Sequence, residues 1–330
     1  MTRLLMALTA SRAADVCDPE TRSMINSRFD AQWLDDHEQL DQALLRERLA
    51  GQDVVLTSWG TPPLPADLLG AGNGGPTVVA HAAGTIKNLV PAESLDKISI
   101  FSAAPRIAWS VGEYCLTALL TLLRRLPEYD DWVRHGGWKT DSFRGRELRG
   151  LTVGIVGASS TARAFIELLR PFGVEIWVYD PYLSAEQAAQ LGVRSVSLEQ
   201  VVGCSVLSVH VPATPATEGL ITADLISRIP DGGIVINSSR AAAVDTAALI
   251  NETATGRLQA ALDVYPSEPP ELPESVLGNG NLLLTPHIAG DSVDGHRALV
   301  RYVLDDVIDF LEHDRRGPSW VDPAKLSITA

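Results

Sequence analysis

The stretch LTVGIVGASSTARAFIELLRPFGVEIWVYDPY, from Leu151 to Tyr182, decides the fold of this chain. An apolar run ends at Gly157, and apolar residues at helical spacing then lead to a second β-rich run, Val174 to Tyr179, which ends on Asp180. Strand, tight turn, helix and strand, with an acidic residue about twenty positions past the turn, are typical of a dinucleotide-binding βαβ unit. The start of such a helix presents free N–H groups to a pyrophosphate.

The glycine fingerprint GxGxxG of these units falls here on Gly157, Ser159 and Ala162. Alanine is a permitted variant at the third position, whereas the second glycine normally lets the backbone approach the pyrophosphate. The Ser159 hydroxyl either contacts a phosphate or weakens binding, and the stretch alone also allows a merely structural turn. The candidate cofactor-binding residues in it are Gly157, Ser159, Ser160, Thr161, Ala162 and Asp180.

Composition and charge restrict the class of protein. The 330 residues are 45% hydrophobic and 21% charged, which is typical of a globular protein long enough for two cores. The net charge of -14 argues against a nucleic-acid or anionic-membrane surface. No apolar run predicts a membrane span, and we interpret the opening MTRLLMALTA as a buried strand rather than a signal peptide. Three separated cysteines, without a CxxC pair, predict reduced core thiols of a cytoplasmic protein, and no metal site is predicted.

Strand and helix signals alternate along the whole chain, which predicts an α/β fold with parallel, doubly wound sheets covered on both faces. The strands predicted outside the opening stretch are 4–8, 53–57, 77–80, 98–101, 206–209, 233–237, 258–264 and 282–284. The predicted helices are 30–50, 66–69, 110–126, 247–253 and 295–311, and a charged excursion with two tryptophans covers 129–150.

Polar residues follow successive predicted strands, where parallel sheets bind their ligands. Three of them form a chemically coherent set, Arg240, Glu268 and His287. A histidine is the usual acid or base near neutral pH, and a carboxylate on its second nitrogen holds the tautomer and favours the protonated form. An arginine grips a carboxylate and polarises a carbonyl.

The sequence resembles the D-isomer-specific 2-hydroxyacid dehydrogenases, the group that includes phosphoglycerate dehydrogenases, D-lactate dehydrogenases and glyoxylate/hydroxypyruvate reductases. The resemblance is carried by SVGEY, VGIVGASSTARAFIELLRPFGVEIWVYDP, HVPATPATEGLI, INSSRAAAVDTAAL, ALDVYPSEPP and LLLTPHIAG, and the family's arginine, glutamate and histidine fall on Arg240, Glu268 and His287. The first hundred residues match only in layout.

The resemblance implies two Rossmann/flavodoxin-like domains, with the cofactor domain inserted into the substrate domain. The expected substrate domain is residues 1–107 and 293–330, and the expected cofactor domain is residues 108–292. The expected cofactor is NAD rather than NADP, because no Arg or Lys directly follows Asp180. Further residues expected to bind the cofactor are His210, Pro212, Thr217, Ser239, Asp263, His287 and Gly290.

The implied reaction is hydride transfer between NAD(H) and a 2-keto or D-2-hydroxy acid, with Arg240 on the substrate and His287, paired with Glu268, handling the proton. The residues expected to bind substrate are Trp59, Ala83, Gly84, Thr85, Arg106 and Arg240. Lys87 and Arg106 favour a substrate with a second anionic group. By the same resemblance we expect a homodimer formed through the cofactor domains and the 129–150 excursion.

Three departures from the family pattern leave alternatives open. Ser159 and Ala241 replace glycines, which puts tight cofactor binding in question, and Ile107 stands where the family often has asparagine. One alternative is a catalytically weak, dinucleotide-sensing regulatory protein of the same fold. Another is a structural relative without a cofactor.

Overall fold

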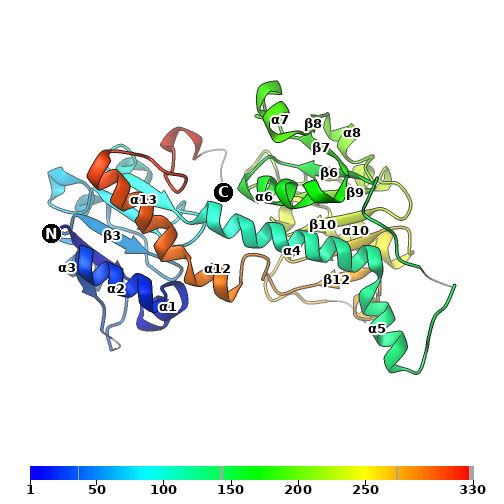
Figure 1. The fold of residues 1–330 in the computed structure, drawn as a ribbon, viewed down its shortest axis with the longest axis horizontal. Coiled ribbons are helices and arrows are strands. Elements are labelled where there is room, and N and C mark those ends of the chain that lie inside the picture. The colour runs from blue at the N-terminus through cyan, green and yellow to red at the C-terminus, as the bar shows by residue number, and fades with distance from the viewer. Residues whose placement is uncertain (36, 142–143, 273, 327–330) are drawn as a thin grey trace. The chain divides into compact units, whose positions relative to one another are not determined.

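The computed structural model describes residues 1–35, 37–141, 144–272 and 274–326 (Figure 1). Parts of four predictions lie outside these ranges. They are residue 36 of the predicted helix 30–50, residues 142–143 of the excursion, residues 36 and 327–330 of the predicted substrate domain, and residues 142–143 and 273 of the predicted cofactor domain. The chain forms two compact units, unit 1 from Met1–Ile107 with Asp291–Ala330, and unit 2 from Ala108–Gly290. Within the described ranges, no helix is long and apolar enough to cross a membrane.

Unit 1 contains a parallel five-stranded sheet in the order β2-β1-β3-β4-β5. The strands are β1 (Arg3–Ala7), β2 (Asp30–Trp33), β3 (Val54–Thr57), β4 (Val78–His81) and β5 (Ser99–Ser102). The helices are α1 (Ala10–Val16), α2 (Pro19–Arg28), α3 (Gln42–Leu49), α12 (Val293–Arg297) and α13 (Leu299–His313). The interpretation of the opening residues as a buried strand is confirmed by β1.

Successive residues of β1 face opposite sides of this sheet, as the two-residue period of a strand requires. Leu4 and Met6 pack in a core with apolar residues of α13, whereas Leu5 and Ala7 pack in a second core with Leu45 of α3. Helices therefore cover both faces of the sheet, which is the layering that an apolar parallel sheet needs.

The predicted helix over residues 30–50 is wrong in its first half. Asp30–Trp33 forms β2, which pairs in parallel with β1, and the helix is confined to Gln42–Leu49. Asp41 accepts hydrogen bonds from the N–H groups of Ala43 and Leu44 and thereby sets the start of α3. Pairing with a strand 27 positions earlier decided the conformation of residues 30–33, and a local apolar period cannot reveal such pairing.

Unit 2 contains a parallel seven-stranded sheet in the order β12-β11-β10-β9-β6-β7-β8. The strands are β6 (Thr152–Val156), β7 (Glu175–Tyr179), β8 (Arg194–Ser195), β9 (Val206–Val209), β10 (Ile234–Asn237), β11 (Gln259–Leu262) and β12 (Leu282–Leu284). The helices are α5 (Leu126–Arg134), α6 (Ser160–Leu169), α7 (Ala185–Leu191), α8 (Leu198–Val201), α9 (Ala223–Ser227), α10 (Thr246–Ala254) and α11 (Glu274–Leu277).

The helix α4 (Ala104–Arg124) begins in unit 1 and continues in unit 2. Its first residue lies six positions before the start of the predicted helix 110–126. The predicted helix 295–311 is interrupted, because α12 ends at Arg297 and α13 begins at Leu299. The predicted helix 66–69 is a single 3-10 turn over Ala66–Leu68.

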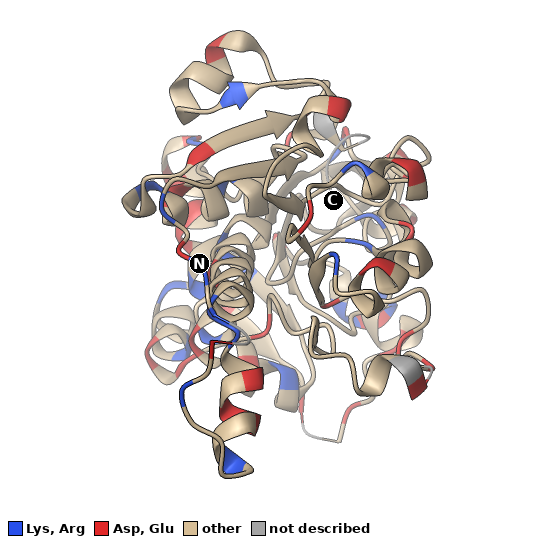
Figure 2. Cartoon of the chain, turned by 90° about the vertical axis from the view of Figure 1, so that its right-hand side faces the viewer, with Lys and Arg blue, Asp and Glu red and all other residues tan. Residues whose placement is uncertain are grey.

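Both sheets confirm the predicted α/β class with doubly wound parallel sheets. In unit 2 the strand order reverses beside β6, because β7 and β8 lie on one side of it and β9 to β12 on the other. The loops after β6 and β9 leave the sheet at this switch point, where doubly wound sheets bind ligands. Figure 2 shows that charged residues lie mainly on helices, loops and strand ends.

Candidate functional site

The turn after β6 can be formed only by a glycine at position 157. Gly157 has φ of +93°, a conformation that residues with a side chain rarely adopt. A Cβ on Gly157 would also lie 2.7 Å from the carbonyl oxygen of His210, which follows β9. The close approach of these two loops thus explains the first glycine of the fingerprint.

Ser159, which occupies the second glycine position, is accommodated without backbone strain. Its φ of -63° and ψ of 175° are open to any residue, and its Oγ accepts the N–H of Ala162 as the N-cap of α6. Within the described residues, the N–H groups of Ser160 and Thr161 have no assigned acceptor. The start of α6 therefore fits a pyrophosphate, with the Ser159 side chain directed to the helix itself.

Asp180, at the end of β7, lies against this turn. One carboxylate oxygen accepts the N–H of Ala158 at 2.6 Å, and the other accepts the N–H of Tyr182 at 2.7 Å. The carboxylate is thereby held beside the turn, where each oxygen keeps a second lone pair for a ribose hydroxyl.

His210 lies in the interior beneath the switch point. Its Nδ1 is 3.0 Å from Oγ1 of Thr161 and its Nε2 is 2.8 Å from Oγ of Ser208. Burial lowers the pKa of His210 to about 3, so the ring is neutral. In the loop that follows His210, Oγ1 of Thr217 donates to the carbonyl of Pro212 at 2.6 Å. This bond closes the loop that contains Pro212 and Thr217, two residues predicted to bind the cofactor.

The structure brings into contact two of the three residues predicted to carry the chemistry, His287 and Glu268. Nδ1 of His287 lies 2.7 Å from Oε2 of Glu268, and Oε1 of Glu268 accepts the N–H of Tyr265. Because a carboxylate only accepts, Nδ1 carries the proton of this bond and Nε2 is the ring nitrogen left to meet a substrate. The hydrogen bond from His287, the N–H of Tyr265 and the positive charge of Arg240 lower the pKa of Glu268.

Asp263 is fully buried and holds the loop that carries His287. Its Oδ1 accepts Oγ1–H of Thr285 at 2.6 Å and the N–H of Ile288 at 2.8 Å, and its Oδ2 accepts the N–H of Ala289 at 2.8 Å. His287 lies between these anchors with φ of +58°, an uncommon conformation for a residue with a side chain. Asp263 therefore holds the loop that carries His287 in place.

Two residues that the sequence did not single out extend this support. The hydroxyl of Tyr114 lies 2.6 Å from Oγ1 of Thr285, and the hydroxyl of Tyr265 donates to the carbonyl of Thr285 at 2.9 Å. The signal that the sequence offers for Tyr114 and Tyr265 is that both lie in stretches shared with the family, SVGEY and ALDVYPSEPP. Among the remaining predicted residues, Ser239 is buried, its Oγ donates to Oδ1 of Asn237, and Gly290 ends unit 2.

Arg240 is half-buried directly after β10. Its guanidinium donates to the carbonyl of Ser239 at 2.6 Å, and its own carbonyl accepts the side-chain amide of Asn237 at 3.0 Å. These bonds hold both the backbone and the side chain of Arg240 at the carboxyl edge of the sheet, next to the strand end that Asp263 follows.

The residues predicted to bind substrate outside unit 2 lie at the carboxyl edge of the unit 1 sheet. Ala83, Gly84 and Thr85 follow β4, and Trp59 follows β3, its ring 5.0 Å from that of His296. Trp59 borders a cavity of about 340 Å³ together with Thr9, Ser11, Arg12, Asp15, Leu40 and Gly60. Arg106 is half-buried in the first turn of α4.

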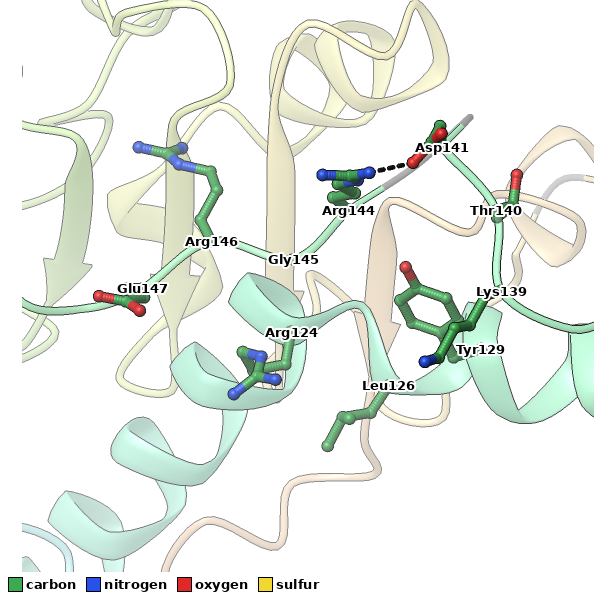
Figure 3. A pocket seen from close by; sticks show the side chains of 10 residues that line it. All are labelled: Arg124, Leu126, Tyr129, Lys139, Thr140, Asp141, Arg144, Gly145, Arg146 and Glu147. Atoms are coloured by element: carbon green, nitrogen blue, oxygen red, sulfur yellow. Dashed lines mark hydrogen bonds and ion pairs between the residues drawn. The ribbon is translucent and has the colours of Figure 1, made fainter.

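A second cavity, of about 760 Å³, lies in unit 2 beside α5 and is lined by none of the predicted site residues (Figure 3). Its lining is Arg124, Leu126, Tyr129, Lys139, Thr140, Asp141, Arg144, Gly145, Arg146 and Glu147. Arg144 pairs with Asp141, and Arg146 donates to the carbonyl of Gly232.

Known proteins with similar sequences match this chain over much of its length. A D-3-phosphoglycerate dehydrogenase of Mycobacterium bovis is 31% identical over 88% of this chain and 54% of its own length. One of Archaeoglobus fulgidus is 34% identical over 61% of this chain and 38% of its own length. A hydroxypyruvate reductase of Thermotoga maritima is 27% identical over 86% of this chain and 92% of its own length. The chain thus spans about half or less of the length of the phosphoglycerate dehydrogenases it matches.

A phosphoglycerate oxidoreductase from Rhizobium etli has a similar solved structure, with a TM-score of 0.83 and 24% identity over 97% of this chain and 98% of its own. This likeness shows a shared fold. The sequence model of the NAD-binding domain of D-isomer specific 2-hydroxyacid dehydrogenases matches residues 116–289, just over half of the chain. Those residues include the fingerprint turn, Asp180 and the Arg240, Glu268 and His287 set, so unit 2 carries a nicotinamide-dinucleotide-binding domain, and the chain belongs to the D-isomer specific 2-hydroxyacid dehydrogenase family.

Proposed function

We propose that this protein is an NAD-dependent D-2-hydroxyacid dehydrogenase that works mainly as a reductase of 2-keto acids. The observation that carries the proposal is the 2.7 Å pair between Nδ1 of His287 and Oε2 of Glu268, with the charge of Arg240 acting on the same carboxylate. An acid, a carboxylate that orients it and a guanidinium are the groups that reduction of a keto acid needs.

Each of the three residues has a distinct role in this proposal. Reduced nicotinamide supplies the hydride when bound. Arg240 binds the substrate through its carboxylate and polarises the keto oxygen, and His287 donates a proton from Nε2 to that oxygen. Glu268, whose lowered pKa keeps it ionised, accepts the Nδ1–H of His287 and thereby leaves Nε2 as the nitrogen that meets the substrate.

We assign the cofactor-binding residues from the geometry of the turn after β6 and from their place at the carboxyl edge of the unit 2 sheet. Gly157, Ser160 and Thr161 would hold the pyrophosphate, and Asp180 the ribose of NAD. Pro181 and Tyr182 follow Asp180, so neither of the two residues after it supplies a cation that would favour the 2′-phosphate of NADP. Titration with NADH and NADPH, followed by protein fluorescence, should give a lower Kd for NADH, and an equal or lower Kd for NADPH would contradict the assignment.

The test of the activity is steady-state oxidation of NADH with a panel of 2-keto acids. Arg240→Ala and His287→Ala should each lower kcat/KM at least about a thousandfold while the fold is retained. Arg228→Ala and His313→Ala are matched controls, because both residues are exposed and lie outside the site. NADH binding without turnover of any keto acid would overturn the proposal in favour of the regulatory alternative.

We propose that Trp59, Ala83, Gly84, Thr85 and Arg106 contribute to substrate binding, and that a second anionic group on the substrate is favoured by Arg106 and Lys87. The panel should therefore include 3-phosphohydroxypyruvate and 2-oxoglutarate beside pyruvate and glyoxylate. A lower KM for the dianionic acids, abolished in Arg106→Ala, is expected. Equal KM values for pyruvate and the dianionic acids would contradict this substrate class.

We propose a homodimer formed through α5 and the segment that follows it. Exposed apolar side chains gather there: Leu126, Trp132, Val133 and Trp138, the last being 73% exposed. Several large exposed apolar side chains within one short segment are typical of a surface that contacts another protein. Light scattering should give twice the chain mass, and Val133→Asp with Trp138→Ser should give the mass of one chain. A monomeric wild type would refute the proposal.

We also propose a cytoplasmic location. Cys17, Cys115 and Cys204 are all buried free thiols, which is typical of proteins kept in a reducing compartment. Fractionation of cells that produce the protein should find it with cytoplasmic markers, and its recovery from the extracellular or envelope fraction would contradict this location.

A further inference from the structure

The side chain of Arg163 lies against the turn that follows β6. Arg163 is the fourth residue of α6 and is exposed, and its Nε donates to the carbonyl of Ala158 at 3.0 Å. A helical side chain leans toward the N-terminus of its helix, which explains how a residue of α6 reaches back to the turn. The guanidinium is therefore held beside the start of α6, the helix that begins at Ser160.

The protein by itself makes this place unfavourable for a cation. The aligned peptide dipoles give the start of a helix a partial positive charge, which repels a guanidinium. The first turn of α6 contains no acidic residue, and in the described parts of the chain no carboxylate forms an ion pair with Arg163. Arg170, directly after the last residue of the same helix, pairs with Glu167 at 3.0 Å. An anion bound at the start of α6 would supply the charge that Arg163 lacks.

Most of the hydrogen-bonding capacity of Arg163 is open to such an anion. The planar guanidinium has five N–H donors, and the bond to Ala158 uses the one on Nε. Among the described residues, the other four donors have no assigned acceptor. Because Nε is anchored, the plane of the guanidinium is restrained, and two of its donors can bind two oxygens of one phosphate.

The family of the chain identifies the anion as a phosphate of the cofactor. Unit 2 carries a nicotinamide-dinucleotide-binding domain. Both forms of this cofactor contain a pyrophosphate, and NADP has a further phosphate on the 2′ oxygen of its adenosine ribose. Arg163 therefore has two phosphates to choose from, and the surroundings of Ala158 favour one of them.

Asp180 favours the pyrophosphate. Its Oδ2 accepts the N–H of Ala158 at 2.6 Å, so Asp180 and Arg163 both bind the same residue of the turn. A 2′-phosphate at this place would be repelled by the carboxylate. The pyrophosphate is attached to the 5′ carbon of the same ribose, so Asp180 can bind the ribose hydroxyls while Arg163 binds the neighbouring pyrophosphate.

We infer that Arg163 is a cofactor-binding residue whose guanidinium binds the pyrophosphate of the nicotinamide dinucleotide. The inference rests on the proposed function for the role of Asp180 at the ribose. It also accounts for Ser159 at the second glycine position of the fingerprint. The Cβ of Ser159 keeps the backbone farther from the pyrophosphate, and a long charged side chain spans the added distance.

The first test removes the charge. Arg163→Ala should raise the Kd of NADH about tenfold, and it should raise the Kd of ADP-ribose, which has the pyrophosphate but no nicotinamide, by a similar factor. Fluorescence titration measures the first Kd and calorimetry the second. Arg170→Ala is the matched control, because Arg170 is an exposed arginine at the other end of α6. It should leave both Kd values at those of the wild type.

The second test distinguishes a charge contact from a role in the shape of the turn. Salt weakens a contact between a guanidinium and a phosphate, so between about 50 and 500 mM NaCl the Kd of NADH should rise more steeply in the wild type than in Arg163→Ala. An unchanged Kd in Arg163→Ala would overturn the inference. A raised Kd with the salt dependence of the wild type would also overturn it, because Arg163 then only holds Ala158 in place.

The third test uses NADPH to separate the two phosphates. NADH and NADPH share the pyrophosphate, so Arg163→Ala should raise both Kd values by the same factor, within about twofold. A loss of affinity confined to NADPH would overturn the inference, because Arg163 then serves the 2′-phosphate.

ADP-ribose also separates this inference from the proposed activity, because it can neither give nor take a hydride. If the wild type binds ADP-ribose about tenfold more tightly than Arg163→Ala but reduces no keto acid, the enzymatic proposal is overturned and the role of Arg163 is kept. If the wild type reduces keto acids and Arg163→Ala has wild-type Kd values for NADH and ADP-ribose, the inference alone is overturned.

Discussion

Nδ1 of His287 and Oε2 of Glu268 lie 2.7 Å apart although the residues are 19 positions apart in the chain. The two residues follow β12 and β11, which are neighbours in the sheet of unit 2. Parallel pairing of these strands therefore brings the acid and its carboxylate together at one edge. The relationship is chemically useful only if the loop that carries His287 keeps its uncommon backbone conformation, with φ of +58°.

Glu268→Gln is expected to lower kcat for keto-acid reduction about 10- to 1,000-fold. The amide keeps the shape of the side chain but puts an NH₂ group against one of the two donors that the carboxylate accepts, Nδ1–H of His287 and the N–H of Tyr265. The imidazole then loses the partner that orients it. Steady-state rates at saturating NADH measure kcat. A wild-type kcat in Glu268→Gln would exclude Glu268 as the partner that orients His287.

Asp263→Asn is expected to lower both stability and turnover. The carboxylate accepts hydrogen bonds from Thr285, Ile288 and Ala289, and an amide in its place puts an NH₂ group against one of these donors. We expect a loss of about 1–3 kcal/mol in the free energy of unfolding and at least about a tenfold loss in kcat. Urea unfolding and steady-state rates measure the two effects. Asp224→Asn, in an exposed ion pair on α9, is the control.

Ser159→Gly is expected to tighten NADH binding by a few fold, because the backbone can then approach the pyrophosphate more closely. The helix loses its N-cap hydroxyl, but glycine at this position costs only a few tenths of a kcal/mol. Ser159→Ala should cost about 1 kcal/mol and should not improve the Kd. Fluorescence titration with NADH measures each Kd. Weaker binding in Ser159→Gly would show that the hydroxyl itself contacts the cofactor.

His210 should make the free energy of unfolding depend on pH. Its pKa is lowered by burial to about 3 in the folded state, against 6.5 for the free side chain, so the unfolded chain binds a proton that the folded chain does not. This contribution to stability is fully present above pH 6.5 and is lost as the pH falls toward 3. The slope is at most about 1.4 kcal/mol per pH unit.

His210→Gln removes this titrating group. Between pH 4 and 6 its unfolding free energy should fall less steeply than that of the wild type, by up to the slope of one proton, even if the variant is less stable at pH 7. Urea unfolding at a series of pH values measures both slopes. His313→Gln, an exposed histidine, serves as the control. Equal slopes in the wild type and His210→Gln would show that the buried ring does not resist protonation.

The βαβ unit of residues 151–182 is predictable because its signals are local. Gly157 at φ of +93°, the apolar spacing of α6 and the β-rich run of β7 each act over a few residues. The set Arg240, Glu268 and His287 is predictable as residue types after strands, because parallel strands end at one edge. The strand β2 is not predictable in this way, because its conformation depends on pairing with β1.

By itself, the sequence determined the alternation of strands and helices, the glycine turn and the kinds of groups at the strand ends. Only the tertiary structure decided which groups meet. It gave Asp263 the role of holding the His287 loop and turned the Ser159 side chain to the helix start. The physical reason is that apolar periods and turn residues act between near neighbours, whereas these hydrogen bonds depend on the packing of strand ends far apart in the chain.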